Sequence, residues 1–332
     1  MIQEAPILID NHGRRVNYLR LAVTDRCNLR CFYCMPAEGI TYLPKPHLLS
    51  FEEMLRLCRI GAEMGIEKVR ITGGEPFLRR DLMQFLRALH KIEGIKQVHI
   101  TTNGVLTLPH VAELKALGIA SINLSLDTTD PKRFHAITRR DEFKQVWQTL
   151  EALLHHEIPT KINAVVMAGI NENDIIPLVN LAKAMPLSVR FIEEMPFNGD
   201  GIRKTDFWDF RRILDEIKGV YPSLQKIGDE AFSTSYNYKI DGFTGNVGVI
   251  AAFSRTFCGT CNRLRVTPTG EVKTCLYADS AWNIRDAMRS GQDDEALKAT
   301  LMNLHQHRHA DGFEAESMRT ESVSESMTTI GG

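Results

Sequence analysis

The chain has 332 residues, of which 43% are hydrophobic and 24% are charged, and its formal net charge is −1. This length fits one barrel with an appended module, and the composition is that of an ordinary globular protein. A net charge near zero provides no overall field that would recruit nucleic acid or an anionic membrane, so neither partner is expected. No apolar run approaches the roughly 20 residues of a membrane span, and the N-terminus lacks the pattern of a signal peptide.

The seven cysteines favour thiolate ligands over disulfides, because a chain without a signal peptide is expected in the reducing cytoplasm. Three of them lie near the start of the chain and three near the end. Cys58 is left over in an apolar helical pattern, which predicts a buried small hydrophobe.

Residues 16–24 alternate and are rich in β-forming side chains, which predicts a first strand. Directly after it, Cys27, Cys31 and Cys34 follow the spacing Cys-x-x-x-Cys-x-x-Cys. Three thiolates this close cannot all pair as disulfides, but one loop can wrap them around a single inorganic centre. An iron–sulfur cubane usually takes four thiolates, so three would leave one iron open. A zinc site completed by a distant histidine and three unrelated core cysteines are the alternatives.

Strand and helix patterns then alternate along the chain. Further strands are predicted over residues 68–72, 97–101, 121–126, 161–167 and 188–193, and helices over residues 50–64, 79–92, 109–117, 142–155 and 173–184. Six strand–helix repeats specify a parallel sheet with right-handed crossovers. No glycine-rich dinucleotide fingerprint follows the first strand, so the predicted fold class is α/β, an incomplete parallel (β/α)6 TIM-type barrel. In such barrels the chemistry lies at the C-terminal ends of the strands.

Several predicted strands end in small or polar residues. At Thr72-Gly-Gly-Glu-Pro76 the two glycines would let a ligand approach without interference from a Cβ, although a tight turn explains an isolated Gly-Gly at least as well. Thr101 to Gly104 and Ser125 to Asp127 place hydroxyls at the next strand ends, where helix caps are the usual role. Met195 follows the strand predicted over residues 188–193, and its spacing alone predicts a core residue.

Beyond residue 196 the pattern changes to a helix over residues 205–218 and looser strands within 233–248. Cys258, Cys261 and Cys275 follow, with Arg263 and Arg265 on one face of an extended segment between them. Such a cysteine set is more often a zinc site when it stands alone, but beside the first motif it predicts a second open-iron cluster. Arginines in this position damp the negative charge of a cluster or bind a substrate anion, and guanidinium geometry favours bidentate phosphate contacts.

The first cysteine motif resembles the signature of the radical S-adenosylmethionine (SAM) superfamily, in which the open iron binds the amino and carboxylate groups of SAM. The likeness to the family of GTP 3′,8-cyclases of molybdenum-cofactor biosynthesis runs essentially from end to end. It is carried by the segments Asn17 to Arg20, Arg70 to Pro76, Thr101 to Gly104, Cys258 to Arg265 and Gly331-Gly332.

The resemblance implies a role for each matching residue. It assigns Cys27, Cys31 and Cys34 to a first 4Fe–4S cluster that binds SAM, and Cys258, Cys261 and Cys275 to a second that binds the substrate. It places SAM against Tyr33, Gly74, Ser125 and Met195, and GTP against Arg20, Arg70, Thr101, Lys161, Arg263, Leu264 and Arg265. Arg263, Arg265 and Arg20 are the candidate catalytic residues.

The same resemblance implies a carbon–carbon lyase. A radical made from SAM would take hydrogen from ribose carbon 3 of GTP, and the new radical would close onto guanine carbon 8 to give (8S)-3′,8-cyclo-7,8-dihydroguanosine 5′-triphosphate. The expected partners are a low-potential electron donor of the flavodoxin or ferredoxin type and cyclic pyranopterin monophosphate synthase, which would receive the product. The sequence does not decide whether the chain forms a homodimer. The alternatives are a radical SAM peptide-modifying enzyme with an auxiliary cluster and a non-enzymatic zinc-binding protein.

Three regions are therefore predicted. Residues 1–200 form the radical SAM partial barrel, residues 201–310 form the iron–sulfur module that closes its mouth, and residues 311–332 form a flexible tail. By the resemblance, the terminal Gly331-Gly332 would reach a GTP site, in its own barrel or in a neighbour's.

Overall fold

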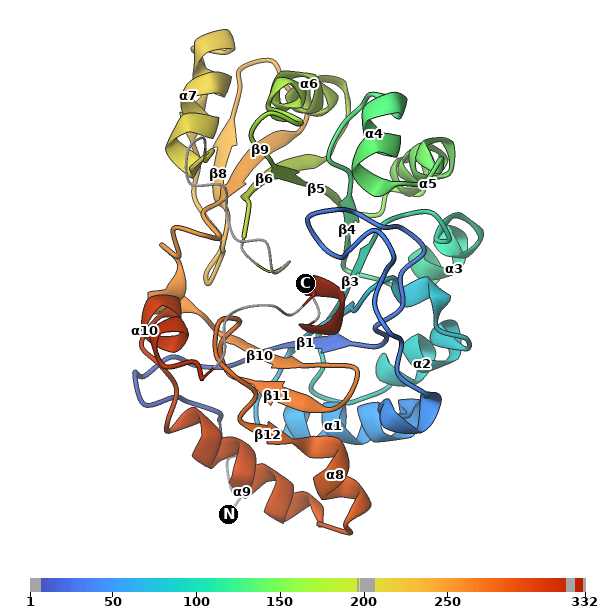
Figure 1. The fold of residues 1–332 in the computed structure, drawn as a ribbon, viewed down its shortest axis with the longest axis vertical. Helices are drawn as coiled ribbons and strands as arrows, with labels where there is room; N and C mark the ends of the chain where they lie inside the picture. Colours follow the sequence, from blue (N-terminus) through green and yellow to red (C-terminus); the bar gives the residue numbers. More distant parts are fainter. Residues whose placement is uncertain (1–6, 196, 198–206, 321–325, 331–332) are drawn as a thin grey trace. The chain divides into compact units, whose positions relative to one another are not determined.

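The computed structural model describes residues 7–195, 197, 207–320 and 326–330. The chain divides into two compact units, of which the first comprises Met1–Asn28, Ile40–Ile100 and Cys258–Gly332 and the second comprises Leu29–Gly39 and Thr101–Phe257. The ribbon of each unit can be followed by its sequence colours in Figure 1. The segment boundaries at residues 200 and 310 stay predictions.

A mainly parallel sheet forms the first unit. Its parallel strands, in spatial order, are β10 (Arg263–Val266), β1 (Tyr18–Ala22), β2 (Lys68–Thr72) and β3 (Gln97–Thr102), whose last two residues belong to the second unit. The strands β11 (Glu271–Lys273) and β12 (Trp282–Asn283) extend the β10 edge in antiparallel fashion. The apolar side chains of β1 and β2 are buried, so the core of this unit lies along these strands.

Among the residues that the structure describes, six α-helices belong to the first unit. They are α1 (Phe51–Glu63), α2 (Leu82–Leu89), α8 (Ile284–Arg289), α9 (Asp294–His305), α10 (Gly312–Ser317) and α11 (Met327–Ile330). Helix α1 begins at a capping box, since the Ser50 hydroxyl accepts from the Glu53 amide and the Glu53 carboxylate accepts from the Ser50 amide. Helix α9 packs against both α1 and α8, which lie near it in Figure 1.

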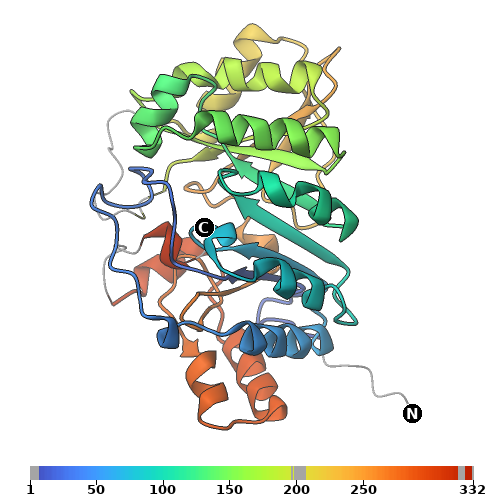
Figure 2. The same cartoon turned by 90° about the vertical axis from the view of Figure 1, so that its right-hand side faces the viewer.

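The second unit has the same construction. Its parallel strands are β4 (Ser121–Ser125), β5 (Thr160–Val166), β6 (Ser188–Glu193) and β9 (Asn246–Ile250), and β8 (Tyr236–Lys239) and β7 (Gln225–Lys226) follow antiparallel at the β9 edge. Its helices are α3 (Val111–Ala116), α4 (Pro131–Thr138), α5 (Phe143–His155), α6 (Ile175–Ala184) and α7 (Phe210–Val220). In Figure 2 the green helices of this unit lie in front of its strands.

The two faces of the second sheet differ in chemistry. Along β5 fully buried and half-buried residues alternate, as expected for a strand covered on one face. Ile162 faces the covered side, whereas Lys161 and Asn163 face the other. Lys161 is in register with Asn123 on β4 and Ser188 on β6, so this second face carries a row of polar side chains.

Short 3-10 helices join several of these elements. They are η1 (Lys45–His47), η2 (Pro76–Leu78), η3 (Leu108–His110), η4 (Glu172–Asp174) and η5 (Cys258–Thr260). No helix in the described part of the chain is long and apolar enough to cross a membrane.

The sequence prediction differs from the structure in several places, and it contained neither α8 nor α9. Helix α4 was not predicted, although Asp130 caps it and Pro131 opens it. Helix α2 begins later than expected because Asp81, with φ 65°, interrupts the helical path. In the tail, which composition predicted to be flexible, the described residues include α10 and α11, and Ile330 is buried.

Candidate functional site

None of the seven cysteines is in a disulfide in the structure. Cys58 is buried in α1, and burial raises the pKa of its thiol to about 12, which confirms the expected core role. The six cysteines of the two motifs are half-buried, as ligands that must accept a metal group would be. Their chemistry fits the thiolate ligation of iron–sulfur clusters.

The first motif spans both units of the chain. Cys27 belongs to the first unit and its carbonyl accepts a hydrogen bond from the Tyr42 hydroxyl (3.3 Å), whereas Cys31 and Cys34 belong to the second. A tight turn joins the latter two, because the Cys34 amide donates to the Cys31 carbonyl (2.9 Å). The amide of Phe32 donates to the Ile137 carbonyl (3.2 Å), which anchors this turn to the end of α4.

Tyr33, between these cysteines, is fixed by Asp127. Its hydroxyl donates to one carboxylate oxygen (2.8 Å), and the other oxygen accepts from the Val165 amide (2.8 Å). Burial raises the pKa of Tyr33 well above its usual value, and Asp127 and the thiols of Cys31 and Cys34 act in the same direction. Burial also raises the pKa of Asp127, to about 6. Tyr33 is therefore a protonated donor whose position is set by the carboxylate at the end of β4.

The two glycines after β2 lie against the backbone that leads into the first motif. A Cβ on Gly73 would lie 2.3 Å from the Thr24 carbonyl oxygen, and one on Gly74 would lie 2.2 Å from that of Arg26. The Gly74 and Glu75 amides donate to these same two carbonyls, at 2.8 and 2.7 Å. The backbone of residues 24–26 therefore lies as close to the two glycines as a ligand was expected to lie. These contacts hold the loop before Cys27 in place.

The second motif surrounds the start of β10. Cys258 and Cys261 lie on and just after η5, and Cys275 follows β11, which pairs antiparallel with β10. Burial and the charges of Cys275 and Cys261 raise the pKa of Cys258. Burial opposes ionisation of Cys261 as well, but Arg263, Arg308 and Arg265 bring its pKa down to about 7. One thiol of this group is therefore prepared as a thiolate by the cations around it.

Five cations and one tyrosine share a face of β10, β1 and β2. The register aligns Arg263, Tyr18 and Lys68 in one row and Arg265, Arg20 and Arg70 in the next. Arg70 Nε donates to the Tyr18 hydroxyl (2.6 Å), and the Arg263 guanidinium and Lys68 ammonium lie 5.8 and 5.0 Å from the Tyr18 ring centre. These six residues are called the cationic face below.

The cationic face has the chemistry of an anion-binding site. Burial, followed by the charges of Arg265, Arg70 and Arg263, lowers the pKa of Arg20 to about 9. Burial alone would raise the pKa of Tyr18, but the surrounding arginines lower it to about 7. Among the residues that the structure describes, Arg265 Nε is a buried donor without an acceptor. Several like charges held together in a buried place are stabilised when a polyanion binds them.

The structure brings together four of the predicted GTP ligands on one face of the first unit. Arg20, Arg70, Arg263 and Arg265 share the cationic face, whereas Leu264 is buried on the opposite face of β10. Thr101 on β3 and Lys161 on β5 belong to the second unit, as do the predicted SAM ligands Ser125, at the end of β4, and Met195, which follows β6. Gly331 and Gly332 lie outside the described residues.

Sequence reasoning did not single out Tyr18, Lys68, Asp127 or Arg308. A signal existed for Tyr18 and Lys68, because each lies two residues before a predicted arginine ligand and alternation puts both members of the pair on one face. Asp127 was visible as the end of Ser125-Leu-Asp127. For Arg308 no local pattern existed.

No three His, Cys, Asp or Glu side chains in the described ranges are close enough to hold one metal ion. A cubane takes one thiolate per iron, so its ligands need not meet at a single point.

Comparison with known proteins agrees with this chemistry. Residues 21–182 match the model of the radical SAM superfamily, and residues 187–313 match that of the Molybdenum Cofactor Synthesis C family. SuiB of Streptococcus suis has the same fold, with a TM-score of 0.61 at 16% identity over 93% of this chain and 70% of SuiB. The partial barrel and the cysteine motif after its first strand thus define a member of the radical SAM superfamily, whose members bind SAM at an iron–sulfur cluster.

The relatives specify the family further. The GTP 3′,8-cyclase of Geobacter sulfurreducens is 40% identical over 98% of this chain and 99% of its own length. Molybdenum cofactor biosynthesis protein 1 of Bos taurus is 40% identical over 94% of this chain but only 50% of its own length, so the chain spans about half of that relative. The chain belongs to the GTP 3′,8-cyclase family.

Proposed function

We propose that the chain is a GTP 3′,8-cyclase, a carbon–carbon lyase of molybdenum-cofactor biosynthesis. The observation that carries the proposal is the cationic face, which lies on the strand that follows Cys258 and Cys261 and on its two neighbours. A triphosphate supplies the negative charge that this face lacks, and guanidinium groups bind phosphate oxygens in bidentate fashion. The 40% sequence identity to the Geobacter cyclase, over 98% of this chain, supports the same substrate.

The chain's own residues would bind and orient the reactants. Arg20, Arg70, Arg263 and Arg265 would hold the triphosphate, and Cys258, Cys261 and Cys275 would hold the second cluster, at which the guanine edge would bind. Tyr33 and Gly74, with Ser125 and Met195, are the proposed surroundings of SAM, and Lys161, Thr101 and Leu264 complete the proposed GTP ligands.

Cys27, Cys31 and Cys34 would hold the first cluster, which would supply one-electron reduction of SAM as the source of the radical. In the remaining steps the protein would contribute by positioning the reactants, since the ribose must be held within about 3–4 Å of the radical carbon and water must be excluded. Arg263 and Arg265 would also stabilise the charge that develops on the cyclised guanine. Arg20, which is paired with Arg265 on the neighbouring strand, would contribute to the same stabilisation.

The reaction requires partners that belong to the proposal. A flavodoxin or ferredoxin of low potential would supply two electrons, one to cleave SAM and one that, with a proton, would reduce the cyclised radical. Cyclic pyranopterin monophosphate synthase would consume the product. A homodimer and a cytoplasmic location are proposed as well, and the lack of a disulfide among the seven cysteines supports a reducing compartment.

The test is an anaerobic incubation of the iron-loaded chain with GTP, SAM and dithionite. Mass spectrometry should find 5′-deoxyadenosine and a cyclised nucleotide in equal amounts, with no cyclised product when ATP replaces GTP. Formation of 5′-deoxyadenosine with no change in GTP would exclude the cyclase and favour a peptide-modifying radical enzyme.

A further inference from the structure

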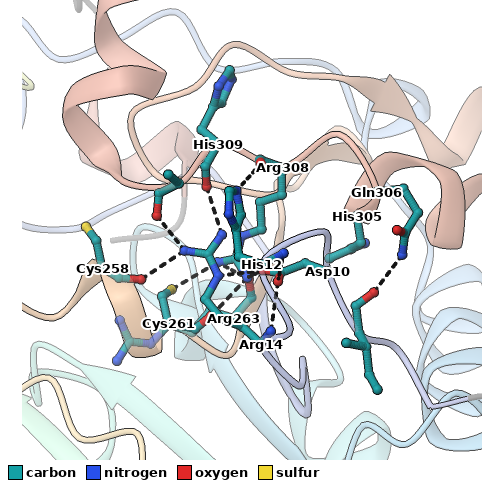
Figure 3. A network of polar contacts seen from close by, with 12 residues as sticks. Asp10, His12, Arg14, Cys258, Cys261, Arg263, His305, Gln306, Arg308 and His309 are labelled. Carbon is teal, nitrogen blue, oxygen red and sulfur yellow. Dashed lines mark hydrogen bonds and ion pairs between the residues drawn. The ribbon is translucent and has the colours of Figure 1, made fainter.

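A buried ion triad lies beside the second cysteine motif. Asp10, Arg14 and Arg308 form it, and Figure 3 shows both guanidinium groups converging on the one carboxylate. The carboxylate of Asp10 accepts from Arg14 Nε (2.6 Å) and from an Arg308 terminal nitrogen (3.1 Å). Its side chain is fully buried, and those of Arg308 and Arg14 are 2% and 8% exposed.

Each arginine of the triad holds one cysteine of the motif. Arg14 donates to the carbonyls of Cys258 (3.0 Å), His309 (2.8 Å) and Ala310 (2.6 Å). Arg308 donates to the Cys261 carbonyl (2.9 Å) and, through its other terminal nitrogen, to Cys261 Sγ (3.1 Å). The contact with sulfur is specific to Arg308 within the triad.

The charges of the triad do not balance by themselves. Asp10 is ionised, since the hydrogen bonds from Arg14 and His12 lower its pKa in spite of burial. Two guanidinium groups against one carboxylate leave one positive charge in excess in a buried place, where an unpaired charge is costly. The nearby His305 adds none, because burial lowers its pKa to about 4. The Cys261 sulfur, at hydrogen-bond distance from Arg308, is the group placed to supply the balancing negative charge.

A hydrogen bond to a ligating sulfur has two effects on a cluster. It fixes the thiolate, and it draws electron density from the sulfur so that an added electron is stabilised. A neighbouring positive charge acts in the same direction. Both effects raise the reduction potential of the cluster.

We propose that Arg308 is a positioning residue for the second cluster: its guanidinium donates to Cys261 Sγ, holds that thiolate and raises the reduction potential of the cluster, while Asp10 fixes the guanidinium. The inference rests on the proposed role of Cys258, Cys261 and Cys275 as cluster ligands. It does not depend on which substrate the open iron binds.

Arg308→Met tests the proposal because it keeps an unbranched apolar stem and removes the charge and the donors. The variant is made in the full chain carrying Cys31→Ala and Cys34→Ala, so that only the second cluster is assembled. Its midpoint potential is measured by EPR-monitored titration with dithionite. We expect a more negative potential, with the ratio of reduced to oxidised cluster about tenfold lower at a fixed solution potential, which corresponds to about 59 mV for one electron.

Arg289→Met is the matched control. Arg289 also binds one carboxylate, that of Glu53 (2.7 Å), and two carbonyls, those of Pro46 (2.5 Å) and Leu48 (3.0 Å), but no cysteine. Its loss removes the same charge and similar contacts, so the potential should equal that of the parent. Equal potentials in the Arg308 and Arg289 variants, with equal iron content, would overturn the proposal.

Arg308→Lys covers the case in which the methionine variant does not assemble a cluster. Lysine keeps the charge beside Asp10, but a single ammonium cannot serve the carboxylate, the carbonyl and the sulfur together. A smaller shift in the same direction supports the proposal, and a parental potential contradicts it. If the unmutated chain holds two clusters but does not cyclise GTP, and the Arg308 variant still shows the shift, the proposed function fails and this inference stands.

Discussion

Four arginines on one face of the sheet would share one triphosphate, so truncation of any one of them should lower the rate of GTP cyclisation. For Arg263→Ala we expect GTP cyclisation to fall by about tenfold to a hundredfold, because a hydrogen bond to a charged group contributes about 1.5–3 kcal/mol. Cleavage of SAM, measured as 5′-deoxyadenosine formed without GTP, should change much less. Arg56→Ala, which removes a surface cation paired with Asp294, is the control. Equal loss of both activities would place Arg263 at a different site.

Tyr18 makes the cationic face sensitive to pH. Its pKa of about 7 means that a phenolate forms among the arginines as the pH rises above neutrality. That negative charge would compete with GTP for the same cations, so GTP affinity should fall by up to about tenfold per pH unit between pH of about 7.5 and 8.5. The affinity is measured by calorimetry without reductant.

Tyr18→Phe should abolish most of this pH dependence, because it keeps the ring beneath Arg263 and Lys68 and removes the ionising group. The folded pKa of Tyr18 also lies below its ordinary value of 10, so the parent should gain stability relative to this variant as the pH rises from about 7 to 10. A parent and a variant with the same pH profile would show that Tyr18 stays protonated.

The turn after β2 positions the loop that leads into the first cysteine motif. Gly74→Ala would place a methyl group 2.2 Å from the Arg26 carbonyl oxygen, which belongs to rigid backbone. We expect the loop before Cys27 to be displaced and the first cluster to be lost, with iron content and SAM binding as the measurements.

Gly219→Ala is the matched control for that prediction. It lies in α7 with nothing within 4 Å of an added Cβ, and alanine in a helix is favoured over glycine by up to about 1 kcal/mol. Normal iron content in Gly74→Ala would show that residues 24–26 can move aside at little cost.

Periodicity in the sequence was sufficient to predict the six strands β1 to β6 and most of the helices between them. The strands β2 and β6 lie where alternation and β-branched residues placed them, and α1 begins at its capping box. Helix α4 was not predicted because its eight residues give too short a periodic pattern between two loops, although Asp130 and Pro131 are typical of a helix start. Tertiary pairings were beyond local patterns: β9 and β10 each add a parallel strand, to β6 and β1 respectively, and nothing near Arg263 indicates its strand partner Tyr18.

The two cysteine groups make a prediction for the whole chain. The intact protein prepared without oxygen should hold about eight irons, four in each of two cubanes. Cys275→Ala should hold about four irons and still cleave SAM, but it should not cyclise GTP, because its remaining cluster is the one that binds SAM. Iron and sulfide analysis with EPR distinguishes the two clusters. A loss of both clusters in this variant would show that the two groups do not assemble independently.

The residue contacts of the second motif come from distant parts of the chain, and this limits what sequence alone could supply. Arg308 is 298 positions from Asp10 and 47 from Cys261, and no periodic signal reaches across such separations. The cysteines and the two arginines between them could be predicted, whereas the ion triad that supports them could not.

Those separations also set an order of events during synthesis. A ribosome releases the cysteines of the first motif early, but the second metal group needs both the turn at residues 10–14 and the segment at residues 308–310, and Arg308 emerges 298 residues after Asp10. Iron delivery to the second group must therefore wait until residues 308–310 have been made, and chains truncated before residue 308 should leave the maturation machinery with one metal centre instead of two.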